Sequence, residues 1–273
     1  MRVTTSLWTT PMKNNRWDID YNTQFKNTIL MCALCVEYAK RSGFYITMHT
    51  DSTGYEVLKE LNYDEIYADL DILDEKIKTN PTILWAGGKA IALDKEPLRT
   101  IHIDNDVFLM KPDIIDEMDF GDADFIFQHV EVSEYKEKEI FRHILTNINM
   151  DKKFACCVGI IGFNSEKAKE QYLNNYKYWF DNLKFDKTSN YTNADLILEQ
   201  LYLYNMMDDM GYKGKALLGD LRSNEMWEIS QKAIKMGYEH VIGYTKFDEY
   251  VLEGLNKRLK RLNPKIYEFV QSL

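Results

Sequence analysis

Short apolar and β-branched runs alternate with longer stretches of helical spacing through the N-terminal part of this 273-residue chain. The short runs predict four strands, at residues 2–8, 44–49, 65–68 and 100–103. The longer stretches predict helices between them, at residues 23–41, 52–61 and 82–93. We expect Asn22 or Thr23 to cap the first helix and Gly43 to end it. Such alternation is typical of an α/β fold with a mainly parallel sheet and helices on both faces.

The remainder of the chain has a mixed pattern that ends in helices. Two further strands are predicted on either side of a polar, helix-prone segment around residues 134–147, at residues 123–129 and 155–163. Helices follow around an irregular segment at 238–245, and they are expected at residues 165–183, 193–210, 224–236 and 247–262. No repeat, low-complexity stretch or linker rich in proline and glycine interrupts the sequence. The pattern therefore predicts one domain over residues 1–273 with a helical C-terminal third.

The composition is that of a compact globular protein, with 45% hydrophobic residues, 13% aromatic residues, 13 glycines and 5 prolines. The net charge of -9 argues against nucleic-acid binding, which needs a basic face. No apolar run approaches the roughly 20 residues that span a bilayer. The first residues lack the apolar core of a signal peptide. A cytoplasmic protein without a transmembrane segment is therefore expected.

The four cysteines are expected to be buried free thiols. Cys32 and Cys35 form a CxxC pair, but it lies within an apolar helical pattern, and Cys156 and Cys157 are adjacent. A zinc or redox centre would need a second ligand pair or an exposed first cysteine at a strand-to-helix turn. Free cysteine otherwise behaves as a small hydrophobic residue.

Two carboxylates, Asp104 and Asp106, stand one residue apart directly after the strand predicted at 100–103. The carboxyl ends of parallel strands are where open α/β sheets bind ligands. Carboxylate oxygens suit Mg²⁺ or Mn²⁺, and substrate phosphates usually complete a magnesium site. The other interpretation is a turn, since Asp and Asn favour turn conformations. The apolar neighbours Ile103 and Val107 favour a rigid metal–diphosphate site over a loose turn. A second D-x-D, Asp122 and Asp124, precedes a strand after a glycine and is expected to be a turn.

Four motifs resemble, in their order along the chain, the nucleotide-sugar glycosyltransferases of the GT-A fold, and most closely the retaining family 8. They are Asp104-Asn105-Asp106, the strand CVGIIGFN at 157–164, the pair Glu199-Gln200, and HVIGYTK at 240–246. The resemblance implies a Rossmann-like sheet, mixed but mainly parallel, flanked by helices. It also implies a nucleotide-binding half at residues 1–110 and an acceptor-side half with the C-terminal helices at 111–273.

The resemblance implies a metal–diphosphate centre built from both halves. His240 would be the third protein ligand of a Mn²⁺ or Mg²⁺ ion held by Asp104 and Asp106, and imidazole suits Mn²⁺ as carboxylates do. Gly243 would let the backbone approach a diphosphate closely. Lys246 would neutralise the departing diphosphate as a point charge. Taken alone, the last motif is equally compatible with a surface loop, a turn and a solvated lysine.

The resemblance places Gln200 nearest the anomeric carbon and Glu199 on sugar hydroxyls. A carboxylate or amide oxygen there can stabilise the oxocarbenium-like centre that forms when the glycosyl bond breaks. Neighbouring residues on a regular helix point about 100° apart, so we expect only one of the two to face the site squarely. An ordinary surface pair is the alternative interpretation.

Donor contacts are expected from Lys89, one turn after Trp85, and from Asn105 within the metal motif. The family's Ala-x-Asp at the end of the first strand is missing here, and TTSLWTTP stands in its place. Trp8 can stack on the base, with Thr5 or Thr9 bonding it, although Trp8 can equally be a core residue.

Other positions near the proposed pocket are less clear. His49 and Asp51 end the second strand, close to such a base pocket. Cys157 replaces the family's Asn, and Phe247-Asp248 follows Lys246 where an aromatic usually comes after Lys-Pro. These two departures put the acceptor contacts and the end of the last motif in doubt.

The sequence therefore predicts a metal-dependent glycosyltransferase that uses a nucleoside-diphosphate sugar, with UDP the favoured nucleotide, and retains configuration. The acceptor is a glycan, a protein or a small molecule. One alternative is a sugar nucleotidyltransferase, although the glycine-rich phosphate loop of that class is missing near the N-terminus. The other is an inactive nucleotide-binding or scaffold domain of the same fold. The aromatic segment at 171–180 is compatible with an acceptor face, a homodimer contact or core packing.

Overall fold

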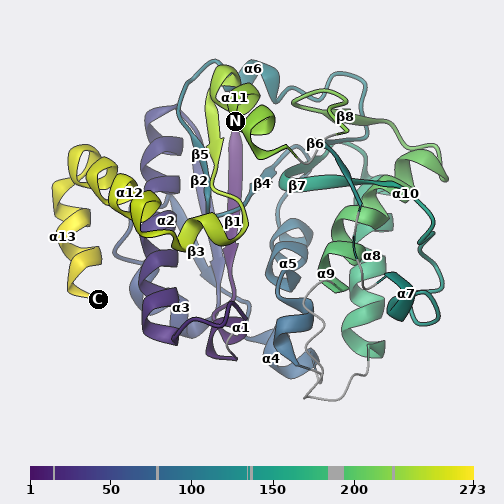
Figure 1. Cartoon of the computed structure of the whole chain (residues 1–273), viewed down its shortest axis with the longest axis horizontal. Helices are drawn as coiled ribbons and strands as arrows, with labels where there is room; N and C mark the ends of the chain where they lie inside the picture. The colour runs from purple at the N-terminus through teal and green to yellow at the C-terminus, as the bar shows by residue number, and fades with distance from the viewer. Residues whose placement is uncertain (15, 78–79, 134, 136–137, 184–193, 223–224) are drawn as a thin grey trace.

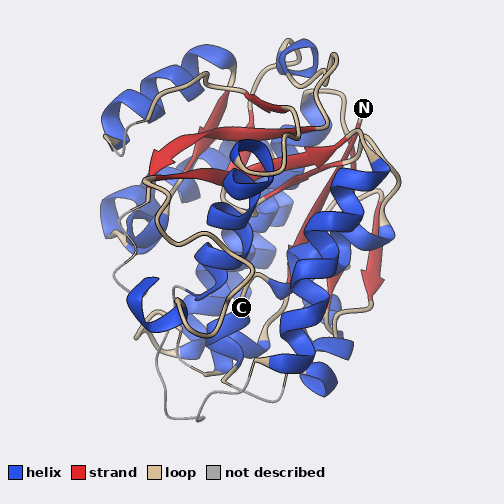
Figure 2. Cartoon of the chain, turned by 90° about the vertical axis from the view of Figure 1, so that its right-hand side faces the viewer, coloured by secondary structure: helices blue, strands red, loops and turns tan. Residues whose placement is uncertain are grey.

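A seven-stranded sheet carries the fold, and helices pack on both of its faces (Figures 1 and 2). The computed structural model describes residues 1–14, 16–77, 80–133, 135, 138–183, 194–222 and 225–273. Across the sheet the strands follow the order β3 (Glu65–Ala68), β2 (Tyr45–Thr50), β1 (Arg2–Leu7), β4 (Ile101–Ile103), β7 (Phe154–Phe163), β6 (Phe125–Val132) and β8 (Gly214–Ala216). This order joins strands from both halves of the chain in one sheet.

The sheet is mixed but mainly parallel, as the sequence predicted. Strands β3, β2, β1 and β4 pair in parallel, and so do β6 and β8. Among the described strands of this sheet, β7 alone runs antiparallel, against β4 on one side and β6 on the other. The carboxyl ends of β1, β4 and β6 therefore lie at the same edge.

Two apolar cores lie on the two faces of the sheet. The helices and short helical turns are α1 (Thr10–Lys13), α2 (Tyr21–Arg41), α3 (Ser52–Leu58), α4 (Ile72–Lys76), η1 (Pro81–Leu84), α5 (Gly87–Lys95), α6 (Ile114–Glu117), α7 (Lys138–Phe141), α8 (Glu166–Asn182), α9 (Ala194–Leu196), η2 (Ile197–Leu201), α10 (Tyr202–Asp208), α11 (Met226–Met236), η3 (Gly243–Phe247), α12 (Glu249–Leu262) and α13 (Pro264–Ser272). Helices α12 and α13 pack beside α2, while α5 packs against β1 and α8 (Figure 1). None of the helices in the described part of the chain combines the length and the apolar character needed to cross a bilayer.

The first long helix begins two residues earlier than predicted. Asp20, rather than Asn22 or Thr23, caps α2, because its carboxylate accepts the backbone N–H of Thr23. Gly43 follows the helix in the left-handed region, with φ +84°, as expected of a residue that ends a helix.

Three predicted segments have a different structure from the one expected. The helix predicted at 82–93 is split into η1 and α5, and that predicted at 193–210 contains the π-helical turn η2. The irregular segment predicted at 238–245 holds strand β9 (Tyr238–His240), which pairs antiparallel with β5 (Val107–Leu109). The sequence pattern did not predict β5, β8 or α13. Residues 134, 136–137, 193 and 224 of the predicted helical segments lie outside the described residues.

Two predictions about buried side chains are settled by this packing. All four cysteines are buried and free, as expected. In the aromatic segment of α8 four rings are buried, which supports core packing, and Tyr178 alone is exposed there. The buried rings are those of Tyr172, Tyr176, Trp179 and Phe180.

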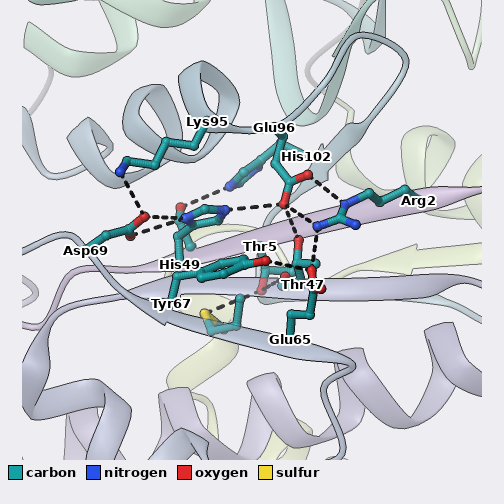
Figure 3. Close-up of polar contacts among 12 residues, drawn as sticks. Arg2, Thr5, Thr47, His49, Glu65, Tyr67, Asp69, Lys95, Glu96 and His102 are labelled. Carbon is teal, nitrogen blue, oxygen red and sulfur yellow. Dashed lines mark hydrogen bonds and ion pairs between the residues drawn. The ribbon is translucent and has the colours of Figure 1, made fainter.

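A network of charged side chains fills the space beneath α5, at the β1–β2–β3 side of the sheet (Figure 3). Glu96 lies at its centre, with Arg2 Nε 2.7 Å from one carboxylate oxygen and Thr47 Oγ1 2.7 Å from the other. His49 Nε2 lies 3.3 Å from Glu96, and His49 Nδ1 lies 3.0 Å from Asp69. These contacts hold the end of α5 against β1 and β2.

Candidate functional site

A cavity of about 770 Å³ opens where β1, β4 and β6 end. Most of the side chains that the sequence singled out line it, although they come from segments far apart in the chain. They are Trp8, Lys89, Asp104, Asn105, Asp106, Glu199, Gln200, His240, Gly243 and Lys246. The cavity thus lies at the carboxyl edge of the parallel strands, where open α/β sheets bind ligands.

Asp104, Asp106 and His240 meet at the bottom of this cavity, with ligand atoms within 4.8 Å of one another. Strand pairing explains how residues so distant in sequence converge. In the β5–β9 ladder Val107 lies opposite His240, and the backbone N–H of Val241 donates to the carbonyl oxygen of Asp106 at 3.0 Å. Asp104 is fixed by its own N–H, which donates to Gly159 O at 2.8 Å. Backbone hydrogen bonds therefore hold in place the segments that carry these three side chains.

The orientation of the His240 ring leaves one nitrogen directed at the carboxylates. Its Nδ1 lies 2.9 Å from Gln128 Oε1, and its Nε2 lies 3.4 Å from Asp106 Oδ1. Since an amide oxygen only accepts hydrogen bonds, Nδ1 carries the hydrogen and Nε2 is free to bind a cation.

The Asp106 carboxylate is buried and ionised. Burial acts to raise its pKa, but Lys246 and His240 outweigh burial and hold the pKa well below its usual range. Lys246 Nζ donates to Oδ2, whereas the buried Oδ1 has no hydrogen-bond partner among the described residues. Such an unsatisfied oxygen beside a second carboxylate and an imidazole fits a metal ligand.

Lys89 connects Asp104 to the π-helical turn that carries Glu199. Its ammonium group lies 3.0 Å from Asp104 Oδ1, 3.1 Å from Glu199 Oε2 and 3.0 Å from the carbonyl oxygen of Val158. Gly88 lets α5 pack closely, because a Cβ there would stand 2.9 Å from the side chain of Leu70, which follows β3. The sequence interpretation of Lys89 as a basic residue at the site agrees with this position.

Glu199 and Gln200 both line the cavity, Glu199 as a buried residue and Gln200 as a partly exposed one. Both lie in the π-helical turn η2 rather than in the regular helix that was expected. Glu199 is buried against Lys89, and burial raises its pKa against the opposing effect of that ammonium. Gln200 Oε1 accepts a hydrogen bond from the Tyr135 hydroxyl at 2.6 Å.

Gly243 and Lys246 reach the cavity from the short turn η3 after β9. Gly243 has φ +64°, a conformation that other residues rarely adopt. The ammonium group of Lys246 also lies 5.4 Å from the centre of the Trp17 ring.

Of the residues expected to contact the nucleotide, Trp8 and Asn105 line the cavity and Thr5 does not. Trp8 lines the cavity, with its Nε1 donating to Asp74 Oδ1 at 2.9 Å, and the Asn105 amide donates to Ser6 O at 2.8 Å. Thr5 lies outside the cavity: its fully buried hydroxyl stands 3.5 Å from Thr47 O. Thr5 lies within strand β1, before its end, which is why it does not reach the cavity.

The other strand-end candidates are structural. Thr9 Oγ1 donates to Asp51 at 2.7 Å, and Asp51 also caps α3. His49 belongs to the charged network of Figure 3. Asp122, as predicted, is an exposed turn residue paired with Lys213, 3.0 Å away.

Two sets of cavity residues escaped the sequence interpretation. The Arg16 guanidinium stands 3.3 Å from the centre of the Trp85 ring and 4.5 Å from that of Trp17. Arg16 follows α1 in an irregular segment that carries no periodic signal. His129 and Glu131 lie on β6. Residues two apart on a strand share a face, but the strand was predicted to end at residue 129, before Glu131.

Comparisons with known proteins add a family and weak structural likeness to solved structures. A family model described as "Family of unknown function (DUF6734)" matches residues 1–273. No curated protein matches the chain. A crystal structure of mouse xyloside xylosyltransferase 1, in its apo form, is similar at a TM-score of 0.40 and 13% identity, over 77% of this chain and 83% of that chain. A likeness at this TM-score supports no inference about the present chain.

Proposed function

The chain belongs to the family of unknown function DUF6734, and we propose that it is a metal-dependent glycosyltransferase that uses a nucleoside-diphosphate sugar. One observation carries the proposal. Asp104 and Asp106, at the end of β4, meet His240 and Lys246 from the β9–η3 segment in a cavity at the carboxyl edge of the sheet. A pair of carboxylates, an imidazole and an ammonium group together suit a divalent cation and the diphosphate it carries.

Asp104, Asp106 and His240 would hold the cation, with Mn²⁺ favoured over Mg²⁺ because one ligand is an imidazole. The unpartnered Oδ1 of Asp106 supports this assignment, since a buried carboxylate oxygen otherwise finds a donor. When bound, such a cation supplies Lewis-acid stabilisation of the charge on a leaving diphosphate.

Lys246 and Arg16 supply the positive charge that a diphosphate needs. Lys246 reaches Asp106 from η3, and the Arg16 guanidinium lies over Trp85 at the cavity wall. Gly243 allows the backbone to approach the same phosphates. Charge stabilisation of this kind is usually the largest contribution to catalysis.

The sugar is expected on the side of η2, where Gln200 and Glu199 line the cavity. The Gln200 amide, held by the Tyr135 hydroxyl, presents an oxygen that can stabilise an oxocarbenium-like centre. Glu199, held by Lys89, is placed to accept hydrogen bonds from sugar hydroxyls. Retention of configuration and a UDP-sugar donor follow from the sequence resemblance to family 8 and belong to the same proposal.

The test is metal-dependent ligand binding followed by turnover. Melting temperatures are measured with UDP, GDP and other nucleoside diphosphates, each with and without Mn²⁺, because tight binding to the folded state raises the melting temperature. A panel of nucleotide sugars is then assayed for release of free sugar and nucleoside diphosphate. We expect one nucleotide to give a metal-dependent shift and its sugar conjugate to be cleaved.

Two variants make this test specific. Asp106→Asn should abolish the metal-dependent shift, whereas Asp122→Asn, in the exposed second D-x-D, should leave it unchanged. No metal-dependent shift with any nucleoside diphosphate would overturn the proposal. Release of pyrophosphate from a nucleoside triphosphate and a sugar phosphate would identify a nucleotidyltransferase instead.

A further inference from the structure

A second group of metal-ligand side chains faces the same cavity, apart from the two aspartates and His240. His129 and Glu131 from β6 and Cys157 from β7 have ligand atoms within 4.8 Å of one another. The strand register explains the grouping, because His129 pairs with Cys157 across the antiparallel ladder. Glu131 lies two residues along β6 and so falls on the same face.

The His129 ring lacks the partners that a buried imidazole normally has. The residue is 1% exposed, and neither ring nitrogen has a hydrogen-bond partner among the described residues. A buried polar atom without a hydrogen-bond partner is destabilising. The described protein atoms therefore leave both ring nitrogens without a partner, which a bound cation could supply.

The other two members of the group are already oriented. The Tyr135 hydroxyl, which also contacts Gln200 Oε1, lies 2.8 Å from Glu131 Oε1, a contact that leaves the second carboxylate oxygen available. Cys157 Sγ lies 3.5 Å from Gln128 Oε1, the oxygen that also accepts from His240 Nδ1. One glutamine amide thus connects the two groups of ligands.

The two groups differ in the cations that they suit. Two carboxylates and an imidazole favour Mn²⁺ or Mg²⁺, whereas a thiol, an imidazole and a carboxylate favour a softer ion such as Zn²⁺. Zinc sites with three protein ligands keep a fourth position open, and here that position faces the cavity. We propose that His129, Glu131 and Cys157 form a second metal site, selective for Zn²⁺ or Co²⁺, whose open position faces the cavity.

The proposal can be tested without a substrate, so it stands or fails independently of glycosyl transfer. Metal-free protein is titrated with Co²⁺, and the thiolate-to-cobalt charge-transfer band in the near ultraviolet is recorded. The matched pair of variants is Cys157→Ala and Cys156→Ala, since the neighbouring Cys156 lies fully buried in the apolar core. We expect the band in the wild type and in Cys156→Ala, at one cobalt per chain, and its loss in Cys157→Ala.

Two further variants separate this site from the first and guard against misfolding. His129→Gln, which keeps the thiol, should weaken Co²⁺ binding more than about tenfold. The double variant Asp104→Asn/Asp106→Asn should keep the band, although it loses metal-dependent nucleotide binding. The proposal is overturned if the wild type gives no thiolate band, if Cys157→Ala keeps it, or if His129→Gln binds Co²⁺ as tightly as the wild type.

Discussion

The ammonium group of Lys89 lies 3.1 Å from the carboxylate of Glu199, and both side chains are almost completely buried. Removing one member of such a pair leaves a charge without a partner in the protein interior. We expect Lys89→Met to lower the free energy of unfolding at pH 7 by about 3–5 kcal/mol. Urea denaturation of the purified variant measures this change.

The same pair offers an internal control through the double variant Lys89→Met/Glu199→Leu. If the two groups form the ion pair seen in the structure, the double variant should lose less free energy of unfolding than the two single variants lose together. The Lys89→Met penalty should also grow as the pH rises. Without the lysine, burial keeps the pKa of Glu199 above its unfolded value, and stability from such a group is lost as the pH rises through the folded pKa. Strict additivity at every pH would contradict this interpretation.

Lys246 is expected to contribute to diphosphate affinity. A charge-assisted hydrogen bond contributes roughly 1.5–3 kcal/mol, which corresponds to about 10- to 150-fold in affinity. Lys246→Met should weaken nucleoside-diphosphate binding by that factor in calorimetric titrations with Mn²⁺ present. Lys257→Met, which removes a lysine from the exposed face of α12, is the matched control and should bind as the wild type does. Equal affinity of the two variants would remove Lys246 from the site.

Glu96, at the centre of the charged network in Figure 3, should determine part of the acid stability. Burial acts to raise its pKa, but hydrogen bonds from His49, Arg2 and Thr47 outweigh burial and lower the pKa to about 2 from the ordinary 4.5. That difference is equivalent to about 3 kcal/mol of stability. Because the folded pKa is depressed, this stability is present above pH 4.5 and is lost as the pH falls through 2.

The variant Glu96→Gln tests this dependence. It should be about 2–3 kcal/mol less stable than the wild type at pH 7, with the gap narrowing as the pH falls below 4.5. Glu65→Gln removes the more exposed partner of Arg2 and should cost about 1 kcal/mol or less. A constant gap between wild type and Glu96→Gln from pH 7 to pH 3, measured by urea unfolding, would contradict the prediction.

Local sequence patterns predicted strands β1, β4 and β6, at whose ends the cavity opens. They did not predict the pairing of β5 with β9, which brings His240 beside the aspartates. The β-branched run at Ile101–Ile103 identified β4, because burial on both faces leaves an apolar signal, and the D-x-D after it identified the two carboxylates at its end. Strands β5 and β9 are three residues each, too short for any periodicity to appear. His240 was found through a motif, and its position opposite Val107 became visible only in the structure.

The positions of the remaining site residues could not be predicted, because they depend on contacts with distant parts of the chain. A regular helix was predicted for Glu199 and Gln200, and no residue pattern signals the π-helical turn in which they lie. Arg16 lies in an irregular segment, where contacts with the Trp17 and Trp85 rings, rather than local propensity, determine its position. Thr5 was assigned to the base pocket from its place in the sequence, yet it lies within β1 opposite Met48 of β2 and is buried there.

Gly159 leaves the space that His240 occupies, which yields a sharp prediction. The residue lies where the β6–β7 register shifts, and a Cβ added there would stand 2.3 Å from His240 Cε1 and 2.7 Å from Gln128 Oε1. Gly159→Ala must therefore push the imidazole out of line with Asp106, while the backbone can stay in place. We expect metal affinity at the first site to fall more than about tenfold with the fold retained.

The matched control is Gly254→Ala on α12, where an added Cβ meets open space. Since alanine is the better helix former, this variant should gain about 0.5–1 kcal/mol of stability and leave metal affinity unchanged. Mn²⁺ affinity, measured through the nucleotide-dependent shift in melting temperature, and far-ultraviolet circular dichroism are recorded for both variants. If Gly159→Ala binds Mn²⁺ as tightly as Gly254→Ala, His240 is not a ligand, and the metal centre must be assigned to Asp104 and Asp106 alone.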